Sequence, residues 1–317
     1  MRIATWSSDG LLRTGLLADG LLVDAARAAA AAEVELDADA HAGVGTRALL
    51  AVAGDARARL GEAAAALAGR GDGIPIEEAR LGPPVPDPQK VLCVGLNYRA
   101  HVDEFGVEAP AAPELFAKFA SSLVGCGEAI VVPPAAGAQV DFEGELAIVV
   151  GRRCKDLRVE DAADAIAGCM PFNDVTAREL QFRSSQWTAG KAIDTFGPCG
   201  PALVTIDELG DLQDLRITTR VNGALVQDAS TALMIFPIAE LLAYASSLMT
   251  LLPGDVIATG TPAGVGFRRE PPLYLAHGDV VEVSVEGVGT LVNPVLAAGD
   301  AAAAGAATGA QGAMRWS

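Results

Sequence analysis

The chain has 317 residues, of which 51% are hydrophobic and 20% charged, and its formal net charge at pH 7 is -17. This composition predicts a folded protein with one sizeable core and room for a smaller module, and it excludes a largely disordered chain. So large an acidic excess disfavours nucleic acid and anionic membranes as partners, because both carry negative charge. We therefore expect a small molecule as the principal partner.

The cysteines and the apolar regions bear on the cellular compartment. The five cysteines are odd in number and show no C-x-x-C spacing, which favours reduced thiols over a disulfide framework or a zinc site. Residues 1–6 lack the apolar run of a signal peptide, and the apolar region 233–252 is interrupted by Pro237 and Glu240. The sequence thus predicts a cytoplasmic protein without a membrane span.

Residues 1–82 are expected to form a small N-terminal domain. Asp-Gly pairs at 9–10 and 19–20 are turn dipeptides that separate short β-type runs over residues 2–24. The stretch 25–70 is rich in Ala, Leu and Arg, which favours one or two helices.

The remainder of the chain divides at a cluster of prolines. Residues 83–89 form a stiff Pro-rich linker, and the main domain is expected to follow over 90–297. Within it, Asn222-Gly223 predicts a hairpin turn and 238–248 predicts an amphipathic helix. The Ala/Gly-rich segment 298–317 is expected to be disordered.

One run, 141–150, alternates acidic and apolar side chains. Read as a single strand, it has an apolar face of Phe142, Leu146, Ile148 and Val150 and an acidic face of Asp141, Glu143 and Glu145. Two glutamates at i and i+2 lie about 7 Å apart and repel each other, so such a strand calls for a compensating cation if it is buried. A hard divalent metal would supply that charge. The alternative is an ordinary solvated strand face.

Two other polar groups have helical spacing. His101 and Glu104 share one face of a helix that follows a strand over 90–95, and a His beside a Glu is the arrangement of a general base with its orienting carboxylate. The alternative is a surface histidine on a polar helix. If a second helix begins near Asp174, then Asp174, Arg178 and Gln181 fall on one face, although Asp174 could instead cap the helix.

Five motifs carry a family resemblance. They are, in order, G-L-N-Y-x-x-H-x-x-E, D-F-E-x-E-L, N-D-x-T-A-R-x-L-Q, W-T-x-G-K-x-x-D-T-F-G-P and P-G-D-V-I-x-T-G-T-P-x-G-V-G. Over residues 90–295 this order resembles the fumarylacetoacetate hydrolase (FAH) superfamily, specifically its bacterial acylpyruvase or fumarylpyruvate hydrolase-like branch. The resemblance implies a β-rich α+β fold, a mixed β-sandwich roll with a small N-terminal α+β domain. It also implies a homodimer.

The resemblance assigns roles to nine residues. The implied metal ligands are Glu143, Glu145 and Asp174, which would hold Mg²⁺ or Mn²⁺, with Ca²⁺ possible. The implied catalytic residues are His101 and Glu104, which activate a water, and Lys191, which stabilises a developing enolate. The implied substrate contacts are Arg178, Gln181 and Thr261. Three readings stay open: Arg178 could instead hold the metal carboxylates, Lys191 could be a solvated loop lysine, and Thr261 could belong to a tight turn without a ligand.

The implied activity is metal-dependent hydrolysis of the carbon–carbon bond of a 2,4-dioxo acid, an acylpyruvate, to pyruvate and a carboxylic acid. Decarboxylation of an oxaloacetate-type β-keto acid, or isomerisation or tautomerisation of a 2-hydroxy-diene-dioate, passes through the same metal-bound enolate and stays open. A non-catalytic binding subunit should have lost ligands or the His-Glu pair, and this chain retains them. The segment 230–236 lacks an aspartate that related sequences often carry before Met-Ile-Phe, so the acyl group stays open.

Overall fold

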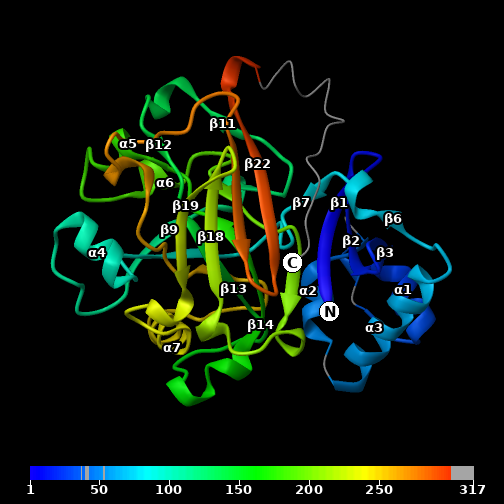
Figure 1. The fold of residues 1–317 in the computed structure, drawn as a ribbon. Coiled ribbons are helices and arrows are strands. Elements are labelled where there is room, and N and C mark those ends of the chain that lie inside the picture. Colours follow the sequence, from blue (N-terminus) through cyan, green and yellow to red (C-terminus); the bar gives the residue numbers. More distant parts are fainter. Residues whose placement is uncertain (37, 40–42, 53, 301–317) are drawn as a thin grey trace.

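The computed structural model describes residues 1–36, 38–39, 43–52 and 54–300. Two β-sheets form the body of the protein, and a smaller helical region lies beside them near the N-terminus (Figure 1). The fold is a β-rich α+β sandwich, as predicted. From residue 301 onward, the tail predicted over 298–317 lies outside the described residues.

The N-terminal strands form the predicted meander of β1 (Arg2–Ser8), β2 (Leu11–Ala18) and β3 (Leu21–Asp24). At the first Asp-Gly pair, Asp9 has φ 52° and Gly10 has φ 76°, the left-handed values that a tight hairpin turn requires. Among the described residues of this region there are three helices, rather than the one or two predicted: α1 (Ala25–Ala32), α2 (Thr46–Ala51) and α3 (Gly54–Ala68). Their buried alanines and leucines pack on the sheet.

The larger sheet joins the N-terminal strands to those of the main domain. Its order is β6-β3-β2-β1-β17-β14-β13-β20-β8-β9, and β7 pairs with β1. The strands not yet located are β6 (Ile74–Pro75), β7 (Leu81–Gly82), β8 (Val91–Gly95), β9 (Glu114–Lys118), β13 (Gly144–Val150), β14 (Ile166–Asn173), β17 (Leu203–Thr205) and β20 (Val256–Ala258). Because β1 pairs with β17, one continuous sheet crosses the proline linker. The division into domains at 83–89 stays a prediction.

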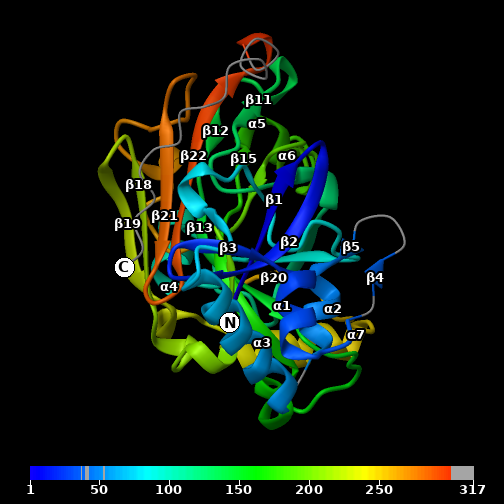
Figure 2. The ribbon, with the colours of Figure 1, turned by 90° about the vertical axis from the view of Figure 1, so that its right-hand side faces the viewer.

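The second sheet stacks on the first, as the edge-on view in Figure 2 shows. Its order is β11 (Ile130–Val132), β22 (Gly289–Ala297), β21 (Val280–Val285), β18 (Arg216–Val221) and β19 (Ala224–Ser230). The hairpin predicted at Asn222-Gly223 joins β18 to β19, with φ 51° and 79° at these two residues. The apolar inner faces of the two sheets form the central core.

Short elements surround the sheets. The paired strands are β4 (Ala38–Asp39) with β5 (Gly43–Val44), β10 (Leu123–Val124) with β16 (Gly197–Pro198), and β12 (Val140–Asp141) with β15 (Thr176–Ala177). The helices are α4 (Arg99–Phe105), α5 (Arg178–Gln181), α6 (Thr188–Lys191) and α7 (Ile238–Leu248). Of these, α7 has the bounds that the sequence predicted.

The strand predicted over 141–150 is two strands. β12 ends at Asp141 and β13 begins at Gly144, because buried side chains accept the backbone N–H groups of residues 142–144, the first of them at Asp141 Oδ1. Glu143 N–H donates to the Asn173 side chain at 3.0 Å, and Gly144 N–H donates to the Gln227 side chain at 2.9 Å. All of β13 is buried, since it lies between β14 and β20 with packing on both faces. The acidic face is therefore inside the protein.

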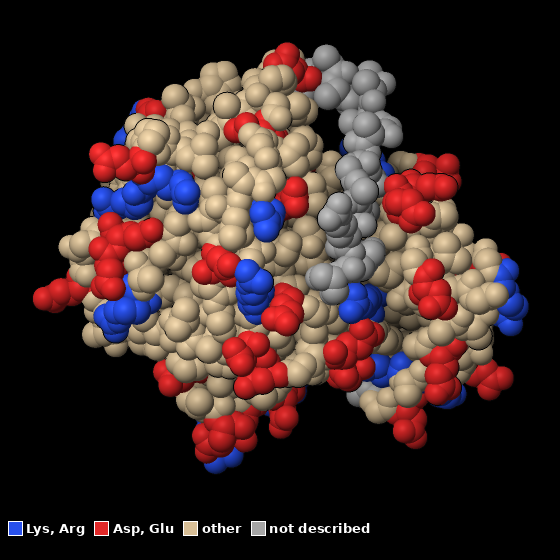
Figure 3. Space-filling model, viewed as in Figure 1, with Lys and Arg blue, Asp and Glu red and all other residues tan. Residues whose placement is uncertain are grey.

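The surface agrees with the acidic composition. On the face in Figure 3, acidic side chains are numerous, and basic ones are scattered among them without a broad basic area. The longest described helix, α3, has 15 residues. None of the helices in the described parts of the chain has the length and apolar character that crossing a bilayer requires.

The close contact of β14 with β17 gives a stability prediction. A Cβ added at Gly168 would lie 2.1 Å from the carbonyl oxygen of Val204, so Gly168→Ala should lower the free energy of unfolding by about 1–3 kcal/mol through overpacking. The matched control is Gly210→Ala, whose added Cβ meets nothing within 4 Å. Urea denaturation of both variants measures the difference, and equal stability would contradict this packing.

Candidate active site

Three carboxylates meet where β13 and β14 lie side by side. Glu143 precedes β13, Glu145 lies within it, and Asp174 follows β14; the antiparallel register pairs Gly144 with Asn173. One oxygen of each carboxylate lies within 4.8 Å of the others, and the three residues are 6%, 1% and 0% exposed. The side-chain cluster predicted from the sequence is therefore present.

Asp174 reaches this cluster from a different local structure than expected. No helix begins near Asp174: α5 begins only at Arg178, and its N-cap is Ala177, so Asp174 does not cap a helix either. Asp174 N–H instead donates to the carbonyl of Glu143 at 2.8 Å, and the next residues form β15 against β12. The sheet, not a helix, places Asp174 beside Glu143.

Three buried cations hold the carboxylates. The Lys191 ammonium lies 2.7 Å from Glu143 and 2.6 Å from Asp174, and Arg178 Nη1 lies 2.7 Å from Glu143 Oε1. Lys191 is thus a buried ion-pair partner and not a solvated loop lysine, since it is 2% exposed.

Lys118, at the end of β9, is the third cation, and the sequence reasoning missed it. Its Nζ lies 2.7 Å from Asp174 Oδ1 and donates to the carbonyls of Val175 at 3.1 Å, Phe196 at 2.8 Å and Lys191. The available signal was a lysine within the apolar run Leu115 to Phe119, because a lysine on a buried strand requires a charged partner.

The carboxylates differ in electrostatic compensation. Burial by itself raises the pKa of the Glu143 carboxyl, but Lys191 and Arg178 outweigh this effect and lower the pKa to about 2. Burial, with the charges of Asp174 and Glu143, raises the pKa of Glu145 well above its usual value. Glu145 forms no ion pair with any described residue; its Oε2 accepts the Gly260 N–H at 2.9 Å. Glu145 therefore has the least compensated charge of the three.

The donor set fits a hard divalent cation. All three candidate ligands are carboxylate oxygens, which Mg²⁺, Mn²⁺ and Ca²⁺ prefer. Counting the neighbouring Asp141, four buried carboxylates face the three cations Lys118, Lys191 and Arg178, an excess of one negative charge when all are ionised. A divalent cation would change this to one positive charge, which favours an anionic substrate.

His101, on α4, faces the cavity beside this cluster, and Glu104 lies behind it on the same helix. His101 Nδ1 lies 3.3 Å from Glu104 Oε2, so the predicted spacing on one helix face is confirmed. Glu104 Oε1 in turn accepts the Gly264 N–H at 2.8 Å. His101 is only 4% exposed and packs against the Phe105 ring at 4.8 Å, so it is not a surface histidine.

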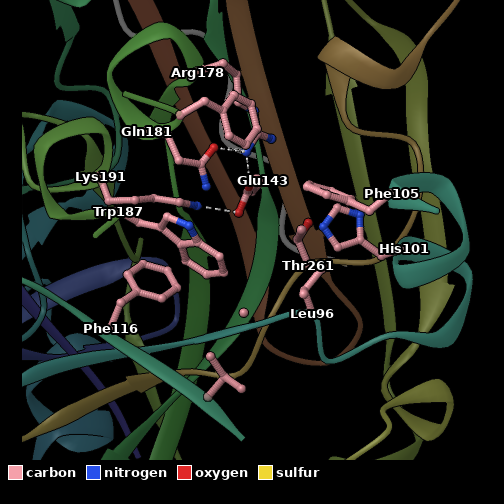
Figure 4. Close-up of a pocket in the computed structure, with 13 residues that line it drawn as sticks. Leu96, His101, Phe105, Phe116, Glu143, Arg178, Gln181, Trp187, Lys191 and Thr261 are labelled. Atoms are coloured by element: carbon pink, nitrogen blue, oxygen red, sulfur yellow. Dashed lines mark hydrogen bonds and ion pairs between the residues drawn. The ribbon is translucent and has the colours of Figure 1, made fainter. Parts of the chain in front are cut away.

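A small cavity brings these groups together (Figure 4). Its volume is about 40 Å³, enough for a few water molecules. Glu143, Lys191 and Arg178 lie on one side of it and His101 on the other. Its aromatic lining consists of Phe105, Phe116, Phe182 and Trp187. These rings limit the access of water and strengthen electrostatic interactions inside the cavity.

The three predicted substrate contacts also line the cavity, and the Arg178 guanidinium, the Thr261 hydroxyl and Gln181 Oε1 already have protein partners. Arg178 bonds Asp141, Glu143 and Gln181, which favours the alternative that it holds the carboxylates. The Thr261 hydroxyl donates to the carbonyl of Gly144 at 3.0 Å and accepts from the Gln227 amide at 2.8 Å. Contact with substrate stays a prediction for all three.

Sequence comparisons identify the family of this chain. The family described as "Fumarylacetoacetate (FAA) hydrolase C-terminal" matches residues 90–296. The rat protein named "Oxaloacetate tautomerase Fahd2a, mitochondrial" is 44% identical over 224 residues, which cover 70% of this chain and 71% of the rat protein. The human protein named "Oxaloacetate tautomerase FAHD2A, mitochondrial" is 44% identical over 241 residues, covering 75% and 76% of the two chains.

Solved structures share the whole architecture. A putative HpcE protein from Mycobacterium smegmatis has a TM-score of 0.77 at 35% identity, covering 94% of this chain and 100% of its own. Maleylpyruvate hydrolase from Sphingobium sp. SYK-6, solved in complex with manganese(II) ion and pyruvate, has a TM-score of 0.74 at 30% identity, covering 94% and 99%. The chain described here therefore belongs to the fumarylacetoacetate hydrolase family.

Proposed function

We propose that this protein is a divalent-metal-dependent enzyme that forms the enolate of a small 2-oxo acid, and that it interconverts the keto and enol forms of oxaloacetate. One observation carries the proposal: Glu143 and Lys191, which belong to the carboxylate cluster, lie across one small cavity from His101. Relatives named as oxaloacetate tautomerases, 44% identical over 70–75% of the chain, support the choice of substrate.

Glu143, Glu145 and Asp174 would hold the metal, which is Mg²⁺ or Mn²⁺ in this proposal, with Ca²⁺ as a third candidate. When bound, a divalent cation would act as a Lewis acid toward the 2-oxo and carboxylate oxygens of the substrate. Lys191 adds a second positive charge beside Glu143 and Asp174. Negative charge that develops on the substrate oxygen is therefore favoured in this part of the cavity.

His101 is the proposed proton carrier. Its Nδ1 faces Glu104, which leaves Nε2 to remove a proton from the carbon beside the oxo group. A proton from solvent water then goes to the enolate oxygen to give the enol, while His101 releases its proton to water. In the reverse sequence, protonated His101 delivers a proton to carbon and the enol oxygen returns its proton to water. Glu104 fixes the orientation of the ring, and its own second oxygen is fixed by the Gly264 N–H.

Hydrolysis of a 2,4-dioxo acid to pyruvate and a carboxylic acid is the second candidate. In that reaction His101 would take a proton from a water molecule that attacks the distal carbonyl. The oriented His101–Glu104 pair favours it, as does the similarity to a maleylpyruvate hydrolase solved with manganese and pyruvate. Decarboxylation of an oxaloacetate-type acid and diene-dioate isomerisation would pass through the same enolate. Homodimer formation and a cytoplasmic location stay predictions.

Metal binding gives the first test of this proposal. The parent should bind one Mg²⁺ or Mn²⁺ per chain, and Glu143→Gln should lose most of that affinity, because it removes one of three charged ligands. Isothermal titration calorimetry measures both. Glu240→Gln, which changes an exposed glutamate in the first turn of α7, is the matched control. Unchanged affinity in Glu143→Gln would refute the ligand assignment.

The role of His101 gives the second test. In His101→Gln, kcat should fall by roughly 10² to 10⁴, the contribution of a general base, while metal affinity stays close to that of the parent. Ultraviolet absorbance of enol-oxaloacetate follows tautomerisation, and pyruvate release from a panel of acylpyruvates follows hydrolysis. His277→Gln, at a half-exposed position outside the cavity, is the control.

The two assays also separate the candidate reactions. Accelerated enol decay without pyruvate release supports tautomerisation, and pyruvate release from an acylpyruvate supports hydrolysis. A His101→Gln enzyme with the parent rate in both assays would show that the proton is moved elsewhere.

A further inference from the structure

Asp141 is a buried carboxylate outside the candidate ligand set, and both of its oxygens are fully engaged. Oδ1 accepts the N–H groups of Phe142 at 2.8 Å and Gly266 at 2.7 Å. Oδ2 accepts the Phe267 N–H at 3.0 Å and two donors of Arg178, Nε at 3.0 Å and Nη2 at 2.8 Å. One side chain thus joins Arg178 to the backbone of the loop 264–269.

On one side, Asp141 orients Arg178, which forms an ion pair with Glu143. Arg178 is 1% exposed, and its Nη1 lies 2.7 Å from Glu143 Oε1 while its other donors face Asp141. A guanidinium is planar, so fixing Nε and Nη2 also fixes the direction of Nη1. The position of the Glu143 carboxylate therefore depends on Asp141 through Arg178.

On the other side, the loop 264–269 holds α4. Gly264 N–H donates to Glu104 at 2.8 Å, and Arg268 Nη2 donates to the carbonyl of Phe105 at 3.0 Å. The Phe267 ring meets the Phe105 ring edge-on at 5.1 Å, and the Arg178 guanidinium lies over the Phe267 ring at 4.4 Å. The helix that carries His101 is therefore attached to the segment that Asp141 holds.

Two glycines permit this close approach of the loop. Gly264 has φ 104°, and a Cβ there would lie 2.2 Å from the carbonyl oxygen of Val226. A Cβ on Gly266 would lie 1.8 Å from the carbonyl oxygen of Leu273 and 2.6 Å from Asp141 Oδ1. Side chains at these positions would push the loop away from Asp141 and from α4.

The opposite side of α4 gives the helix little support. A cavity of about 310 Å³ lies there, lined by α4 residues Arg99, Ala100 and Asp103 and by residues of β19 and the segment 262–263. Only His101 and Val102 of α4 are buried, and the helix projects from the edge of the molecule in Figure 1. The segment 234–236 holds the start of α4 through Asn97 and Tyr98, and the loop 264–269 holds its C-terminal part, at Glu104 and Phe105.

From these contacts we propose that Asp141 is a positioning residue, which keeps the His101–Glu104 pair aligned with Glu143 by holding Arg178 and the loop 264–269 together. Its catalytic consequence rests on the function proposed above, but its structural consequence does not. A displacement of about 1 Å is enough to cost roughly 10²-fold in rate, so this alignment matters even though Asp141 touches no substrate.

Asp141→Asn is the central variant, because asparagine keeps the size of the side chain but cannot accept all five hydrogen bonds. At saturating Mg²⁺, kcat should fall roughly 10²-fold while KM changes little, since the displaced groups act on the reacting atoms. In a double variant that also carries His101→Gln, Asp141→Asn should lower kcat hardly further than His101→Gln alone does. The reason is that Asp141 acts by positioning a base that this variant no longer has. Multiplicative losses in the double variant would overturn the proposal.

Hydrogen–deuterium exchange supplies a readout that does not require activity. Backbone amides of α4 should exchange faster in Asp141→Asn than in the parent, and those of α7 should not change. If the parent catalyses neither candidate reaction, the proposed function fails while this measurement still tests the positioning role. Unchanged exchange in α4 would overturn the positioning role even if the enzyme were active.

If Asp141→Asn does not fold, the variant Arg268→Met can still test whether the loop 264–269 holds α4. It removes the hydrogen bond to the Phe105 carbonyl from the solvent-exposed side of the loop and should also speed exchange in α4. Arg220→Met removes a similar hydrogen bond, from an exposed arginine to the Gly223 carbonyl, and is the matched control. Equal α4 exchange in the two arginine variants would contradict the dependence of α4 on this loop.

Discussion

The structure depends on how it balances ionised carboxylates inside a core. Glu143, Glu145, Asp174 and Asp141 are all buried, and an unpaired buried charge costs several kcal/mol. Lys118, Lys191 and Arg178 offset most of that cost, and each contacts at least one of the carboxylates at 2.6–3.0 Å. Such a network stabilises the fold only if each carboxylate lies beside its cation. The fold and the site therefore depend on each other.

The sheet provides that register. β13 and β14 carry the acidic residues at adjoining ends, and β9 and α6 bring in the two lysines from opposite directions along the chain. The aromatic residues around the cavity then restrict water, which makes each charge interaction stronger. Glu145 has the least compensated charge of the three carboxylates, and a bound divalent cation would supply the missing positive charge with a matching preference for oxygen ligands.

The parts predictable from sequence were those determined by local rules or by ordered motifs. Asp-Gly and Asn-Gly pairs predicted the hairpins because those turns need left-handed backbone, and apolar periodicity predicted α7. The resemblance supplied the residues that meet in the cavity. Local rules failed where tertiary contacts override them: side chains of Asn173 and Gln227 interrupt the strand at Glu143, and the β12–β15 pairing delays the helix after Asp174.

Lys118 and Asp141 show a second reason for incomplete prediction. Lys118 matters because it pairs with Asp174, and Asp141 matters because it pairs with Arg178 and the loop 264–269. These partners lie far away in the sequence, so the local pattern of apolar and polar residues does not indicate them. Likewise, nothing in the sequences of β1 and β17 indicates that these two strands pair across the proline linker. Long-range charge pairs and the order of strands in the sheet can be identified only from the folded structure.

Enolate formation at this site is the central claim, and proton exchange tests it more directly than turnover of any one substrate. Pyruvate contains the 2-oxo acid group but has no acyl or second carboxylate group to lose. In D₂O with Mg²⁺, the enzyme should exchange the methyl protons of pyruvate for deuterium, as followed by proton NMR, and His101→Gln should exchange them far more slowly. If the parent enzyme binds Mg²⁺ and pyruvate but the methyl protons exchange for deuterium no faster than without enzyme, the account is contradicted.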